Sequence, residues 1–237
     1  MWVAVILAAT LVIGAAVQGL VGLGLGLVAA PVTTLLEPQL MPGLLLWLAF
    51  LLPVITLVRD HHQIDWRGLS WALPARVPGT AIGVVLVSWF SARELGIAVA
   101  LMVLASVLVT LRSIELSVTR PILLAAGLVS GIAGTTTSIG GPPLAILYQH
   151  RPPTQIRSTL AVYFLCGAGL SLVGLGLAGS LNRATFLLAA AMVPCLFLGF
   201  AVSRLLHRAV PAHHIRGGVL IVCAASAMAL LVKSLLV

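Results

Sequence analysis

The chain has 237 residues, of which 61% are hydrophobic and only 8% are charged, and its mean hydropathy is +1.19. Soluble domains are about 45–50% apolar and about 25% charged, so this composition excludes a water-soluble globular protein and a disordered chain. The formal charge of +8 is carried by dispersed single residues rather than by a basic run, which argues against a nucleic-acid partner. The long stretches that are apolar on every side also disfavour a membrane β-barrel and indicate an all-α polytopic membrane protein.

Charges, glycines and prolines divide the first half of the chain into apolar segments. They predict five helices, over residues 3–19, 25–36, 43–58, 68–90 and 95–112. A glycine-rich stretch from Gly19 to Gly26 separates the first two helices, and a polar loop over 59–67 separates the third from the fourth. No positively charged segment precedes the first apolar stretch, so we expect it to be part of the mature fold and not a cleaved signal peptide.

The second half of the chain repeats this order. It predicts helices over residues 121–132, 142–150, 156–178, 184–206 and 214–236. A second glycine-rich stretch, from Gly131 to Gly141, separates the first two of them. At an offset of 112 residues, Gly19, Gly22 and Pro31 match Gly131, Gly134 and Pro143; at an offset of 116 residues, Arg67, Pro78 and Gly83 match Arg183, Pro194 and Gly199. We therefore predict two repeats, over 1–115 and 116–237, that form one membrane unit.

The distribution of Lys and Arg distinguishes two arrangements of these repeats. If each repeat crosses the membrane four times, the loop cations divide six to six and give no orientation. If each glycine break instead forms a re-entrant hairpin that is followed by three transmembrane helices, the repeats are inverted and the cations divide nine to three. The nine are Arg59, Arg67, Arg112, Arg120, Arg151, Arg157, Arg204, Arg208 and Arg216, against Arg93, Arg183 and Lys233. We favour this second arrangement, in which the nine are cytoplasmic and both termini are periplasmic.

The two glycine breaks are the main candidates for a binding site, because paired interrupted segments mark the substrate site of many transporters. Half-helices that start near Leu25 and Pro142 would direct N–H groups and partial positive charge into the membrane centre. Hydroxyl groups in the second break add further donors, so we predict a site for a small oxyanion. The predicted residues are Gln18, Gly19, Gly22, Gly24, Gly26, Ser130, Gly131, Gly134, Thr135, Thr136, Thr137, Ser138, Gly140 and Gly141. The alternative is that these glycines serve close helix packing alone.

Arg76 is the one charge well inside an apolar helix, about 12 Å from the predicted helix start. Ionisable residues inside a membrane are costly and usually functional, so we interpret Arg76 as a ligand of the anion. Its counterpart in the second repeat is the uncharged Met192, so the charge is not part of the framework that the repeats share. The alternative is that Arg76 extends to the cytoplasmic interface or pairs with a carbonyl group.

The other reactive residue types form no catalytic or metal-binding pattern. The three cysteines lie far apart in apolar segments, and Ser138 is not in a Gly-x-Ser-x-Gly motif. Most histidines lie in predicted loops, where we expect them to be solvated. These residues are Cys166, Cys195 and Cys223, and His61, His62, His150, His207, His213 and His214. We therefore predict no enzyme activity, no metal site and no cofactor.

Both glycine breaks resemble the motif of a known family. Val17-Gln18-Gly19 through Pro31, and Ser130-Gly-Ile-Ala-Gly134 through Gly140-Gly141-Pro142-Pro143, resemble the TauE/SafE sulfite exporter family over essentially the whole chain. The resemblance implies export of small oxyanions such as sulfite, or of sulfonates and related organic acids, across a bacterial inner membrane. Both breaks contain fewer glycines than those of many relatives, so the resemblance does not define the substrate.

We therefore expect a membrane transporter that exports a small oxyanion by alternating access between two repeats. The expected partners are the anionic substrate and the lipid bilayer, and a homodimer is left open. The alternatives are an anion channel and a membrane scaffold without transport. All five acids lie near segment ends, so we expect the membrane potential alone to drive export.

Overall fold

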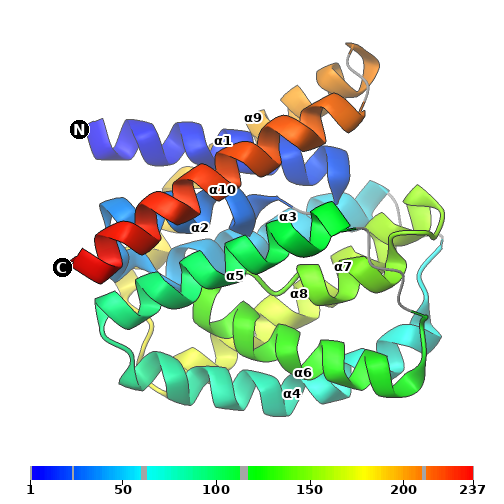
Figure 1. The fold of residues 1–237 in the computed structure, drawn as a ribbon, viewed down its shortest axis with the longest axis horizontal. Helices are drawn as coiled ribbons and strands as arrows, with labels where there is room; N and C mark the ends of the chain where they lie inside the picture. Colours follow the sequence, from blue (N-terminus) through cyan, green and yellow to red (C-terminus); the bar gives the residue numbers. More distant parts are fainter. Residues whose placement is uncertain (1, 23, 60–62, 113–116, 210–211, 237) are drawn as a thin grey trace.

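The computed structural model describes residues 2–22, 24–59, 63–112, 117–209 and 212–236, which form a bundle of helices (Figure 1). The helices are α1 (Trp2–Val21), α2 (Leu25–Leu36), the 3₁₀ helix η1 (Pro38–Leu40), α3 (Gly43–Arg59), α4 (Trp66–Trp89), α5 (Ala92–Arg112), α6 (Arg120–Thr137), α7 (Pro142–Tyr148), α8 (Pro153–Leu177), α9 (Arg183–Ala209) and α10 (Ala212–Leu236). His61, His62 and the predicted repeat boundary at 115/116 lie outside the described residues, as do the side chains of His207, His213 and His214.

Six of the described helices are long and apolar enough to cross a membrane, namely α1, α4, α5, α8, α9 and α10. This confirms the predicted all-α membrane class. One detail differs from the expected hairpin. Helix α1 has 20 residues, or about 30 Å, which equals the thickness of the hydrocarbon core, whereas α3 has 17. The first glycine break therefore follows a helix of full membrane length.

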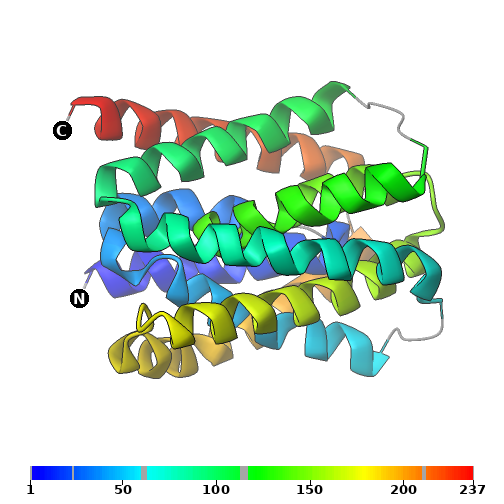
Figure 2. The ribbon, with the colours of Figure 1, turned by 90° about the horizontal axis from the view of Figure 1, so that it is seen from below.

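The helices run lengthwise between two ends of the bundle (Figures 1 and 2). Helix α1 begins and α10 ends at the same end, here called the terminal end. At this end Lys233 Nζ donates a hydrogen bond to the Leu35 carbonyl at 2.7 Å, and Arg93 Nη2 donates to the Leu235 carbonyl at 3.3 Å. The opposite end, here called the basic end, carries Arg67, Arg120, Arg151 and Arg157. Four of the nine cations that the sequence places on one side thus lie at one end of the bundle, and the full nine-to-three division and its orientation in the membrane remain predictions.

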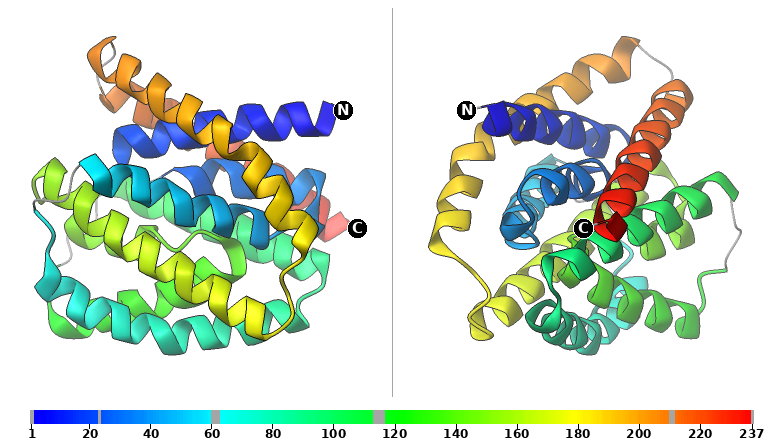
Figure 3. Two further views of the ribbon diagram at one scale, coloured as in Figure 1. Left: turned by 180° about the vertical axis from the view of Figure 1, so that it is seen from behind. Right: turned by 60° about the vertical axis from the view of Figure 1, so that its left-hand side comes forward.

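The helix pairs follow a pattern that relates the two halves of the chain. Helix α1 packs against α9 and α6 against α4, while α3 packs against α8 and α5 against α10. Exchanging each helix for its counterpart in the other half maps these pairs onto one another. Helix α9 crosses the outside of the bundle obliquely beside α1 (Figure 3), and α1 and α6 run in opposite directions (Figure 1). This pattern supports the inverted repeats, which remain a prediction.

The matched glycines lie at equivalent helix crossings. A Cβ added to Gly83 would meet Thr135 Cβ of α6 at 2.7 Å. A Cβ added to Gly199 would meet Ala15 Cβ of α1 at the same 2.7 Å. Both positions therefore require glycine because a neighbouring helix approaches closely. Close packing of this kind is the alternative role that the sequence analysis gives for the glycines of the two breaks.

The second break is shorter than the sequence indicates. Helix α6 continues to Thr137, so the break covers only residues 138–141. The hydroxyl of Thr136 donates to the Ile132 carbonyl at 2.9 Å, and that of Thr137 donates to the Ala133 carbonyl at 2.7 Å. Close packing of α6 against α4 overrides the low helix propensity of glycine and threonine here. The helix ends at Ser138, whose φ of 61° is left-handed.

Candidate functional site

Helix α4 carries Arg76 into the centre of the bundle. Arg76 lies ten residues after Trp66, the first residue of α4, and therefore about 15 Å along the helix. Asp65 caps this helix by accepting a hydrogen bond from the Gly68 N–H at 3.0 Å. Its second oxygen accepts from the Tyr148 hydroxyl at 2.7 Å. The start of α4 is thus fixed to the end of the short helix α7.

The Arg76 side chain is 3% exposed and contacts two other helices. Its Nη1 donates to Ser130 Oγ of α6 at 3.3 Å, and the Ser130 hydroxyl in turn donates to the Gly140 carbonyl in the second break. Its Cζ lies 4.5 Å from the ring centroid of Tyr163 on α8. A guanidinium has five N–H donors. The contact with Ser130 is its one hydrogen bond to the described residues, and Nε is buried without a partner among them.

No carboxylate of the described residues pairs with Arg76. Glu37 is the C-cap of α2, Asp65 caps α4, and Glu94 lies in the first turn of α5. The remaining two acids, at positions 60 and 115, lie outside the described residues. The guanidinium of Arg76 is therefore buried without an acidic partner among the described residues. The guanidinium contacts interior residues, so it does not extend to an interface.

A cavity of about 50 Å³ lies beside Arg76, between the two glycine breaks. Eight predicted residues line it: Gln18, Gly24, Gly26, Arg76, Gly134, Ser138, Gly140 and Gly141. Phe164 and Ala168 of α8 and Leu46 and Ala49 of α3 complete much of the wall. One water occupies roughly 30 Å³ in the liquid, so the cavity has the size of one or two waters or of a small oxyanion.

The other predicted glycines lie outside this cavity. Gly19 packs against Ser203 of α9, and Gly131 packs against the backbone of α4. Gly22 ends α1 with a φ of 83°, a conformation that glycine adopts without steric cost. These positions shape the helices around the site rather than its wall.

The predicted hydroxyl donors bond mainly to protein atoms. The hydroxyls of Thr135 and Ser171 share a hydrogen bond of 2.8 Å between α6 and α8. Those of residues 136–137 donate within α6. The Ser138 hydroxyl donates to the Pro42 carbonyl at 3.0 Å, although Ser138 lines the cavity. The Ser138 hydroxyl therefore ties the second break to the residue before α3, while the threonine hydroxyls bond within α6 or to α8.

The two half-helices differ in the donors that they offer. The first N–H group of α2, that of Leu25, donates to Gln18 Oε1 at 3.0 Å. The N–H groups of the next two residues lie in the first turn, where a helix has no internal acceptor for them. Helix α7 begins with Pro142 and Pro143, which have no N–H group. The first turn of α2 therefore offers backbone donors to the cavity, whereas the first two residues of α7 offer none.

A second cavity, of about 200 Å³, adjoins the first. The two share Gly24, Leu27 and Pro142 as wall residues. The larger cavity is mostly apolar and reaches Thr110 at the end of α5 and Ile156 at the start of α8. It therefore extends from the anion-sized cavity toward the basic end of the bundle.

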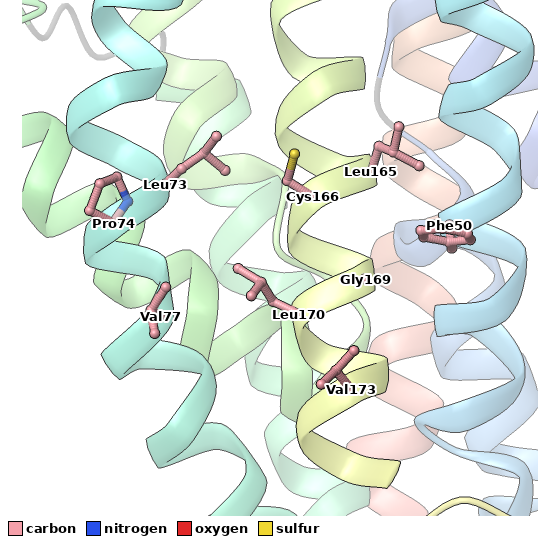
Figure 4. Close-up of a pocket in the computed structure, with 9 residues that line it drawn as sticks. All are labelled: Phe50, Leu73, Pro74, Val77, Leu165, Cys166, Gly169, Leu170 and Val173. Carbon is pink, nitrogen blue, oxygen red and sulfur yellow. The ribbon is translucent and has the colours of Figure 1, made fainter. Parts of the chain in front are cut away.

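A third hollow, of about 560 Å³, is an outward-facing groove between α3, α4 and α8 (Figure 4). Cys166 and Leu170 of α8 lie on the side that faces Leu73 and Val77 of α4, and Phe50 of α3 lies on the other side of α8. The groove has apolar walls apart from one thiol. We do not assign an anion to it, because it has no charge and no strong hydrogen-bond donor.

Besides the apolar wall residues, two residues that contact Arg76 were missed by the sequence reasoning. The ring of Tyr163 lies against the Arg76 guanidinium, and a Cβ added to Gly167 would collide with the same guanidinium. Together with Ser171 they are spaced by four residues, which places them on one face of α8. The sequence shows this spacing and contains only two tyrosines, but it does not show which helix opposes that face.

These observations define the chain as a multi-pass helical membrane protein, in which two interrupted helices and a buried cation enclose a small interior cavity. This is the type of site that secondary transporters use. A family model described as "Sulfite exporter TauE/SafE" matches residues 6–230, so the chain belongs to this family. The match confirms the resemblance, and a family of membrane transporters fits the expectation that the chain is not an enzyme. No curated protein and no solved structure matches the chain.

Proposed function

We propose that the protein exports small oxyanions, sulfite among them, from the bacterial cytoplasm across the inner membrane, with the basic end in the cytoplasm. Arg76 is the observation that carries this proposal, since it is a buried cation without a carboxylate partner among the described residues. Placing an arginine at the centre of a membrane helix costs about 2.5–3.5 kcal/mol on insertion scales. A bound anion supplies the missing counter-charge.

The proposed site combines one charge with backbone donors. The guanidinium provides N–H groups that have no protein acceptor among the described residues, and the first turn of α2 provides its N–H groups and the positive end of its dipole. The volume of about 50 Å³ favours a small inorganic oxyanion in this conformation. We assign the direct contacts to the eight predicted residues in the wall, a positioning role to Ser130, which bonds to Arg76, and a packing role to the other six.

The proposed route to the site starts at the basic end. The cavity of about 200 Å³ extends toward that end, whereas Leu44 and Leu45 of α3 are fully buried on the terminal side. We assign this conformation to the inward-facing state of the cycle. Movement of the two repeats relative to each other would then open the terminal side.

A labelling experiment tests this route. In a variant whose three native cysteines are replaced by alanine, Ala145→Cys lies in the wall of the larger cavity. We expect a membrane-impermeant thiol reagent to label it in inside-out vesicles and to leave it unlabelled in right-side-out cells. Val99→Cys of α5 is the matched control, because Val99 is fully buried and lies in the wall of neither cavity, so it should react from neither side. Labelling of residue 145 from outside the cell alone would contradict the assignment.

Transport itself is tested with purified protein in proteoliposomes and labelled sulfite. Each negative charge that moves across the membrane gains about 2.3 kcal/mol per 100 mV, which is roughly a fiftyfold accumulation. We therefore expect saturable uptake into inside-positive vesicles and little uptake when the potential is reversed. Equal uptake at both potentials would contradict potential-driven transport. Saturable counterflow would exclude a channel, and folded protein without flux for any small oxyanion would favour a scaffold.

A further inference from the structure

We propose that Tyr163 is the positioning residue of the anion site, because its ring holds the Arg76 guanidinium beside the cavity without cancelling its charge. This inference rests on the proposed function and adds a residue that the sequence reasoning did not identify. The ring of Tyr163 would explain how the buried guanidinium of Arg76 keeps a fixed orientation while its charge stays available to the substrate.

The geometry around the guanidinium carries the proposal. The Tyr163 ring is fully buried, and its centroid lies 4.5 Å from Arg76 Cζ, within the distance at which a cation is attracted to the face of a ring. One helical turn further along α8, Gly167 has no side chain, so the guanidinium also lies directly against the backbone. On its other side it contacts Ser130. The guanidinium is thus confined between α6 and α8.

An aromatic ring can hold the Arg76 guanidinium in place without competing with the substrate, whereas a carboxylate at this position would compete. A carboxylate would form an ion pair with Arg76, and the substrate would then have to displace it. The face of the ring attracts the cation but accepts no conventional hydrogen bond, so the N–H groups stay available for an oxyanion. The ring therefore orients the cation while the charge remains for the substrate.

The interaction uses the ring of Tyr163 and not its hydroxyl. The hydroxyl is buried and has no hydrogen-bond partner among the described residues. We therefore expect phenylalanine to replace tyrosine and an aliphatic residue to fail. This contrast separates the proposed role from a role in which the hydroxyl binds the substrate.

The first test compares Tyr163→Leu with Tyr163→Phe in the sulfite flux assay. We expect Tyr163→Leu to raise KM about tenfold or more, the size of effect expected for loss of a desolvated cation–π contact, with a smaller change in kcat. Tyr163→Phe should return KM to within about twofold of wild type. Equal KM values for wild type and a folded Tyr163→Leu variant would overturn the inference.

A second series keeps the shape of the ring constant. Phenylalanine with increasing numbers of ring fluorines, incorporated at position 163, weakens the attraction to a cation stepwise because fluorine withdraws electron density from the ring face. We expect KM for sulfite to rise with each added fluorine, and a flat series would overturn the inference even if Tyr163→Leu does not fold. Failure of the proposed function looks different, because wild-type protein would then show neither sulfite flux nor sulfite binding.

Discussion

Arg76→Met is expected to abolish sulfite flux and to leave the substrate-free protein at least as stable as wild type. Loss of one member of a buried charge pair costs about 2–5 kcal/mol of binding energy, so affinity for the anion should fall by about thirtyfold or more. Methionine has a similar length and carries no charge, and replacing a buried charge by an apolar side chain is often neutral or stabilising. Flux and thermal unfolding of the same preparations measure both effects.

Added sulfite separates a binding role for Arg76 from a structural one. A ligand that binds only the folded state raises its melting temperature, so we expect sulfite to raise that of wild type but not that of Arg76→Met. Arg93→Ala is the matched control, since Arg93 lies at the terminal end and contacts the Leu235 carbonyl. It should keep both flux and the thermal shift. Wild-type KM in Arg76→Met would remove Arg76 from the site.

Helix positions could be predicted well wherever charges and prolines mark the ends of apolar segments. The predicted helix over 25–36 coincides with α2, and that over 43–58 differs from α3 by one residue. The prediction was less accurate at the end of α6, where it stopped at residue 132 and the helix continues to Thr137. Local propensity disfavours Gly131, Gly134 and the threonines, but contact with α4 stabilises the helix there, and such long-range packing is not visible in one sequence.

The candidate site could be predicted only in part, because some of its residues are recognised only from long-range contacts. Arg76 was recognised because a charge in an apolar helix is rare, and the glycine breaks were recognised because they interrupt helices. The structure places both features around one cavity. Tyr163 and Gly167 did not stand out, since a buried tyrosine and a helical glycine are ordinary in an apolar segment. Their importance depends on a contact with Arg76 that spans 87 residues between positions 76 and 163, which only the fold reveals.

Ala168→Asp is expected to block transport by giving Arg76 an internal counter-ion. Ala168 is 3% exposed, lines the cavity and directly follows Gly167, which lies against the guanidinium. A carboxylate there would pair with Arg76 in a medium of low dielectric constant and occupy the place of the substrate. We expect flux to fall to the level of Arg76→Met, while sulfite no longer raises the melting temperature. Ala168→Asn adds nearly the same volume without charge, so it measures the steric part of the effect.

A double variant shows whether the two charges interact. In Ala168→Asp combined with Arg76→Met the carboxylate has lost its partner, and an unpaired buried charge costs about 3–5 kcal/mol of stability. The double variant should therefore be much less stable than Ala168→Asp alone, whereas Arg76→Met should have little effect on stability in the Ala168→Asn background. Equal flux in Ala168→Asp and Ala168→Asn would mean that the charge of Arg76 does not bind the substrate. Loss of flux in the Asp variant alone, together with this coupling, would show that transport requires an arginine whose counter-ion is the transported anion.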